Sequence, residues 1–178
     1  MRPAKRPGEY VVIGEYDILA SEPAINYGQM VKVNASGALS LQTAVAGNLV
    51  LGTFSGCKYV DATGRPTVSK NWPGVVTGAT NIVGYVEDVA NLIYEVQADG
   101  PVTATKIGAQ GLLTNDGVVN ALGFPTAVLS TASLSHSVAN QLMIVGLQRD
   151  TDNAWGDAFT KVLVKFSQTQ MYGSVAPF

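Results

Sequence analysis

Helical periodicity is missing from this sequence, because no segment keeps apolar residues at helical spacing for more than about two turns. Short apolar runs recur instead at intervals of about 8–12 residues. Turn-forming groups such as NASG (34–37) and DATG (61–64) separate these runs, and the 19 glycines and 8 prolines are spread along the chain. The sequence therefore predicts an all-β fold, either a β-barrel or a β-tulip-like sandwich.

The clearest pair of strands flanks the segment QRDTDNAWGDAF (148–159). The first strand lies within NQLMIVGLQRD (140–150), and the second lies within AFTKVLVKFSQTQMY (158–172). Side chains alternate between the two faces of a strand. The second strand thus places Val162, Val164 and Phe166 on one face, and Lys161, Leu163 and Lys165 on the other. We expect a hairpin here, with the polar segment as its turn.

One short helix and an N-terminal arm complete the predicted organisation. The segment VTATKIGAQGLL (102–113) is the one plausible helix, with Thr103 or Thr105 as its N-cap. Residues 1–15 are predicted to form an extended arm, since two prolines near the start discourage a helix. Residues 16–178 are predicted to form a single β-rich domain.

The three aspartates of the 148–159 segment invite comparison with a calcium loop. An EF-hand loop needs oxygen ligands at positions one, three and five, glycine at six and glutamate at twelve. Counted from Asp150, position five is Ala154, glycine falls at seven, and position twelve is Lys161. The EF-hand pattern therefore fails, although an irregular cation site stays open. Turn geometry explains these residues better, and we expect Arg149 to pair with an aspartate there.

Catalytic and cofactor motifs are not found in the sequence. The one histidine, His136, lies between serines without a nucleophile elbow, and the glycines match neither a Walker loop nor a dinucleotide fingerprint. The one cysteine, Cys57, can form neither an internal disulfide nor a paired metal site, and we expect it to be buried. We predict that the protein is not an enzyme, has no small-molecule substrate and needs no cofactor or metal.

The composition favours a protein that acts through contacts with other proteins. Charged residues make up 13% of the chain, about half the usual share, and the net charge is −2. This charge offers no field for nucleic acid, and no apolar run is long enough to cross a bilayer. The first ten residues lack a secretory signal, so we expect synthesis in the host cytoplasm. The candidate partner-binding residues are the basic and aromatic residues of the arm and the two tryptophans: Arg2, Lys5, Arg6, Tyr10, Trp72 and Trp155.

Four segments in order resemble structural proteins of tailed bacteriophages. They are INYGQMVKVNASGAL (25–39), NLVLGTFSGCKYVDATGRPTVSKNWPG (48–74), IYEVQADGPVTATKIGAQ (93–110) and QLMIVGLQRDTDNAWGDAFTKVLVKFSQTQ (141–170). More specifically, the chain is similar to the small β-rich cement or decoration proteins of podophage capsids. The resemblance covers roughly residues 25–172, and the block 145–170 is its most specific part. The N-terminal arm matches no pattern of that family.

The resemblance implies a virion protein on the capsid exterior. Such a protein binds the major capsid protein, commonly as a homotrimer, and stabilises the shell by bridging neighbouring capsid subunits. Two alternatives stay open from the residues themselves. One is a tail-tube or head–tail joining protein, which is also β-rich and of similar length. The other is a carbohydrate-binding or adhesin-like β-module, in which aromatic residues should line one exposed groove.

Overall fold

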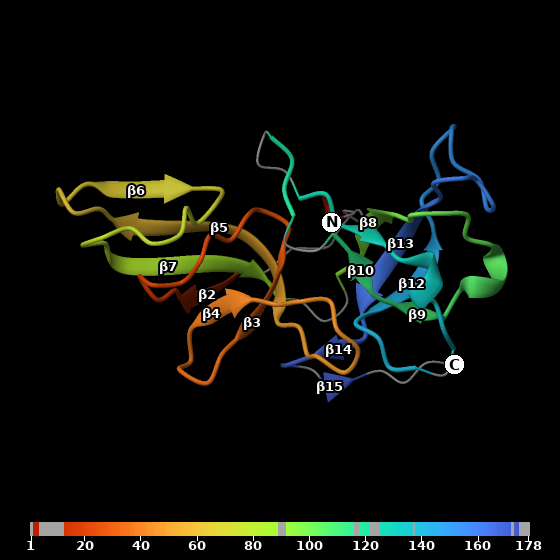
Figure 1. Cartoon of the computed structure of the whole chain (residues 1–178), viewed down its shortest axis with the longest axis horizontal. Helices are drawn as coiled ribbons and strands as arrows, with labels where there is room; N and C mark the ends of the chain where they lie inside the picture. Colours follow the sequence, from red (N-terminus) through yellow and green to blue (C-terminus); the bar gives the residue numbers. More distant parts are fainter. Residues whose placement is uncertain are drawn as a thin grey trace.

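Antiparallel strands form nearly all of the regular structure, which confirms the predicted all-β fold. The computed structural model describes residues 2–3, 13–88, 92–115, 118–121, 125–136, 138–171 and 173–174. Two larger sheets follow one another along the long axis of the molecule (Figure 1). In the described residues, the only helices are two single 3-10 turns, η1 (Ala104–Lys106) and η2 (Thr131–Ser133). The predicted short helix is thus reduced to η1, which has Thr103 at its N-cap position.

The first sheet is built from residues 13–87 in the order β2-β7-β5-β3-β4, with β6 beside β5. Its strands are β2 (Ile13–Asp17), β3 (Met30–Val33), β4 (Leu39–Leu41), β5 (Gly52–Val60), β6 (Pro66–Ser69) and β7 (Thr80–Glu87). A bridge between Ile18 and Leu39 brings the two ends of this order together, so the sheet curls towards a barrel. The turns after Asn34 and Asp61 are those predicted, and in each the side-chain oxygen accepts backbone N–H groups of the turn.

The second sheet has the order β1-β8-β13-β12-β9. Its strands are β1 (Arg2–Pro3), β8 (Tyr94–Gln97), β9 (Gln110–Gly111), β12 (Leu142–Leu147) and β13 (Lys161–Phe166). Two short pairs accompany the sheets: β10 (Leu113–Thr114) with β11 (Val128–Leu129), and β14 (Gln168–Thr169) with β15 (Gly173–Ser174). The hairpin of β12 and β13 confirms the sequence prediction. In β13 the residues Val162, Val164 and Phe166 are buried, whereas the intervening residues are partly exposed.

The predicted arm, residues 1–15, lies mostly outside the described residues. Arg2 and Pro3 form β1, which pairs with Glu95 and Tyr94 of the same chain. Residues 13–15, which the sequence assigned to the arm, belong instead to strand β2 of the first sheet. Lys5, Arg6 and Tyr10 are not among the described residues, and their role as partner-binding residues stays a prediction.

Each sheet has its own hydrophobic core. Ile25, Leu39, Leu51, Phe54 and Trp72 are the largest fully buried side chains of the first core. Tyr94, Leu129, Leu142, Ile144 and Phe166 are central to the second core, which also includes Met30 and Val50 from the first half of the chain. The prediction that residues 16–178 form a single domain therefore depends on how the two sheets are joined.

Residues 167–170 join the two sheets. The backbone of Val50 donates to the carbonyl oxygen of Gln168 (2.9 Å) and accepts from the N–H of Gln170 (3.0 Å). The side-chain amide of Gln170 bonds the N–H and the carbonyl oxygen of Val33, at 2.8 and 3.0 Å. A second connection is Tyr94, whose buried hydroxyl donates to the carbonyl oxygen of Glu87 at 3.2 Å.

Cys57 is buried in the first core, as predicted, and burial raises the pKa of its thiol to about 11. Because a raised pKa keeps the thiol neutral, almost no thiolate exists at pH 8. We expect Cys57 of the native protein to react with a disulfide reagent such as DTNB at least ~100-fold more slowly than in the chain unfolded in guanidinium. The absorbance of the released thiol measures both rates. Similar rates in the two states would contradict the burial of Cys57.

Candidate protein-interaction site

The loop between β12 and β13, residues 148–160, projects from the end of the second sheet (Figure 1). Asn153 holds its base together. The side-chain nitrogen of Asn153 donates to the carbonyl oxygens of Gln148 (2.6 Å) and Lys161 (2.8 Å), and its side-chain oxygen accepts the N–H of Lys161 (2.8 Å). Val102 holds the loop from the other side, because its carbonyl oxygen accepts the N–H of Gly156 (2.8 Å).

Replacing Asn153 should loosen this loop. We expect Asn153→Ala to lower the free energy of unfolding by about 2 kcal/mol, since three hydrogen bonds are lost and their backbone partners are partly buried. Urea titration followed by circular dichroism measures the change. The matched control is Asp152→Ala, which removes a side chain that is 74% exposed and should change stability little. A loss for Asn153→Ala no larger than for the control would contradict the role of Asn153 in closing the loop.

The three aspartates of the loop form contacts within the loop and with the strand that follows it. The Lys161 ammonium lies 3.5 Å from both the Asp150 and the Asp152 carboxylates, and these two charges raise the pKa of Lys161. Asp157 accepts the backbone N–H of Ala154 at 2.6 Å. The expectation that Arg149 pairs with an aspartate is wrong, because Lys161 takes that place. Within the described residues, no group of three or more acidic, histidine or cysteine side chains could hold a metal ion.

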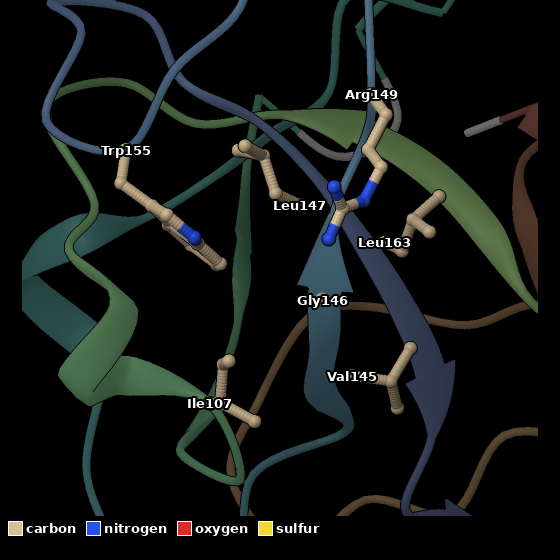
Figure 2. A pocket seen from close by; sticks show the side chains of 7 residues that line it. All are labelled: Ile107, Val145, Gly146, Leu147, Arg149, Trp155 and Leu163. Carbon is tan, nitrogen blue, oxygen red and sulfur yellow. The ribbon is translucent and has the colours of Figure 1, made fainter.

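An apolar hollow of about 490 Å³ lies below this loop. Its lining comes from the turn after η1, from β12 and β13, and from the loop: Ile107, Val145, Gly146, Leu147, Arg149, Trp155 and Leu163 (Figure 2). A β-bulge in β12 helps to shape it, since the register with β13 shifts between Ile144 and Gly146. A bulge bends its strand and re-aims the neighbouring side chains. The hollow is of the size of pockets that bind ligands, about 300–1,000 Å³.

Trp155 and Arg149 give the hollow its two distinctive groups. The half-buried Trp155 indole packs against the second core and forms one wall of the hollow. Arg149 is exposed, and its guanidinium is directed over the hollow between Leu147 and Leu163 (Figure 2). Among the residues that the structure describes, none forms an ion pair with Arg149. The site thus combines an apolar surface, one aromatic ring and one available positive charge.

The candidate tryptophans have different fates in the structure. Trp72 is fully buried, donates its indole N–H to the carbonyl oxygen of Glu22 (2.9 Å) and meets the Tyr59 ring edge-on. The prediction of Trp72 as a partner-binding residue is therefore wrong, because a core side chain has no surface to offer. Trp155 lies at the hollow and stays a candidate. Phe159, at the end of the same loop, is 63% exposed and was not predicted.

Sequence reasoning missed the aliphatic lining of the hollow. Leu163 had a signal, since it lies between two lysines on the face of its strand opposite Val162 and Val164. Ile107, which is 45% exposed, had none, because an apolar residue after a short helical turn is more often buried. His136 is exposed, and its ring lies 3.2 Å from the carbonyl oxygen of Thr105, outside the hollow.

Comparison with known proteins identifies no relative: no protein-family model, no curated protein and no solved structure matches this chain. Within the part of the chain that the structure describes, no helix is long and apolar enough to cross a membrane. Any functional conclusion therefore depends on the sequence and on the site itself.

Proposed function

We propose that this chain is a virion structural protein that decorates the outside of a phage capsid and stabilises it by bridging neighbouring major capsid subunits. The observation that carries the proposal is the set of large apolar side chains left exposed. Val68 is 80% exposed, Val75 is 70%, Phe159 is 63% and Met171 is 60%. Charged residues are depleted at the cores of protein interfaces, so exposed apolar side chains on a chain with 13% charged residues support a role in contacts with other proteins.

Exposed apolar side chains occur in both larger sheets or the loops beside them, which suits a bridging protein. Val68 belongs to β6 of the first sheet, whereas Phe159 ends the loop of the second sheet. A protein that clamps two capsid subunits needs contacts at both ends, and a homotrimer multiplies these contacts through effective concentration. The sequence resemblance to podophage cement proteins supports the same function.

Binding without catalysis is part of the proposal. Within the 148–160 loop, the Asn153 and Asp157 side chains are engaged in its turns, and those of Asp150 and Asp152 in the ion pairs of Lys161. A glycan-binding module is less well supported, since Trp155 is the only aromatic residue among the described residues that line the hollow. In the adhesin-like alternative, several aromatic side chains should line one exposed groove.

Cryo-electron microscopy of virions of the phage that encodes this chain tests the proposal. We expect density for the chain in many copies on the outer surface of the shell, between capsid subunits. Density only in a ring or stack in the tail would overturn the proposal in favour of a tail or joining protein. Light scattering of the purified protein tests the trimer separately, and we expect three times the mass of one chain.

A further inference from the structure

Among the described residues that line the hollow, Arg149 is the one charged group, and no described residue forms an ion pair with it. Asp150 and Asp152 follow Arg149 by one and three residues, yet both carboxylates lie 3.5 Å from the Lys161 ammonium. The Arg149 guanidinium instead points over Leu147 and Leu163 (Figure 2). An arginine in this position can form two parallel hydrogen bonds with a carboxylate, while its planar group covers apolar surface.

We propose that the hollow binds a peptide segment of a partner protein in which a large apolar side chain neighbours an acidic residue. The apolar side chain enters the space bounded by Ile107, Trp155 and Leu163. The acidic side chain pairs with Arg149 at the rim. This inference rests on the proposed function in one respect, namely that the chain acts by contacting proteins.

The residues that line the hollow do not suit a phosphate group as the anionic ligand. Phosphate groups are usually held by several basic side chains or by a row of backbone N–H groups. Here the described lining has one guanidinium among four aliphatic side chains and one indole. A single carboxylate on an otherwise apolar group is the occupant that matches this set. The aromatic ring and the arginine are also the residue types that contribute most to protein interfaces.

Two matched peptides test the proposal directly. The probes are acetyl-Leu-Phe-Glu-amide and acetyl-Leu-Phe-Gln-amide, which differ only in the carboxylate. Binding is followed by NMR through the indole N–H signal of Trp155, which is assigned by its loss in Trp155→Phe. We expect the Glu peptide to bind about three- to tenfold more tightly than the Gln peptide, as for a partly exposed charge-assisted pair. Equal affinities, or no shift of the Trp155 signal up to the solubility limit of the peptides, would overturn the proposal.

Three variants separate the contribution of the Arg149 charge to peptide binding from that of the apolar space. Arg149→Gln should abolish the preference for the Glu peptide while retaining weak binding of both. Gly146→Val should weaken both peptides, since no atom lies within 4 Å of a Cβ placed on Gly146 and the new side chain can enter the hollow. Lys165→Gln is the matched control, because Lys165 also lies on β13 but does not line the hollow. A preference that survives Arg149→Gln, or is lost in Lys165→Gln, contradicts the role of Arg149.

Failure of this inference can be told apart from failure of the proposed function. Attachment of the wild-type protein to capsids, measured by co-sedimentation, tests the function. If the wild-type protein attaches and the peptides do not bind, the inference about the hollow is wrong and the function stands. If the peptides bind as expected and the protein does not attach, the capsid proposal is wrong and the hollow remains a peptide site.

Discussion

Trp72→Ala is expected to lower the free energy of unfolding by about 3–5 kcal/mol, the range for removing a large aromatic side chain from a core. Trp72 is fully buried in the first core. Its removal leaves a cavity, takes away the edge-on partner of Tyr59 and leaves the carbonyl oxygen of Glu22 without the indole donor. The backbone around Trp72 is fixed by its two bonds with Ile25, so it cannot easily collapse into the space.

Urea titration followed by far-ultraviolet circular dichroism measures this effect, because the signal does not depend on tryptophan fluorescence. Trp155→Ala is the matched control, because it makes the same substitution at the other tryptophan. It should lower the free energy of unfolding clearly less, since Trp155 is only half-buried at the hollow. Similar costs for the two variants would contradict the assignment of Trp72 to the core and of Trp155 to the surface. The comparison also decides which tryptophan a partner can contact.

Gly52→Ala is expected to destabilise the protein by about 3 kcal/mol, although it adds only one methyl group. A Cβ at Gly52 would overlap the carbonyl oxygen of Glu87 and would lie 2.9 Å from a methyl group of Val86. The carbonyl group is backbone within the pairing of β5 and β7, so it cannot move aside without disturbing the sheet. The same carbonyl oxygen accepts the Tyr94 hydroxyl, so the contact between the two sheets should weaken as well.

Gly146→Ala is the matched control, since it adds the same methyl group to another strand where no atom lies within 4 Å. We expect its free energy of unfolding to stay within about 1 kcal/mol of the wild type, because glycine in a strand is itself unfavourable. Chemical denaturation of both variants gives the comparison. Equal stability of Gly52→Ala and the wild type would show that β5 and β7 lie farther apart than the structure indicates.

Local patterns predicted much of the fold. The alternation of buried and partly exposed residues in β13 follows from six consecutive residues of the sequence. The hairpin with β12 was predictable because a polar turn segment separates the two strands. The turns at Asn34 and Asp61 were equally readable, since side chains that accept backbone N–H groups act over a few residues. The ion pairs of the loop were not predicted, since the sequence suggested Arg149 as the partner of an aspartate, whereas the structure places Lys161 beside Asp150 and Asp152.

Contacts between distant segments could not be predicted in this way. Trp72 follows a polar stretch and precedes a proline and a glycine, which is typical of a loop, yet its backbone pairs with Ile25 and its ring enters the core. The hollow likewise combines residues from the turn after η1, from the hairpin strands and from the loop, and no local sequence pattern predicts that they meet. The composition of the second core could not be predicted either, since Met30 and Val50 lie in the first half of the sequence but pack in that core.

The segment that joins the two sheets also bears on how the chain is made. Met30 and Val50 are synthesised early, but their packing partners Leu142, Ile144 and Phe166 leave the ribosome much later. The backbone partners of Val33 and Val50, residues Gln168 and Gln170, come later still. During synthesis, the apolar side chains of Met30 and Val50 therefore stay exposed to solvent until these later residues are made. Residues 142–170 must therefore leave the ribosome before these contacts form, and synthesis of the first half of the chain alone is not sufficient.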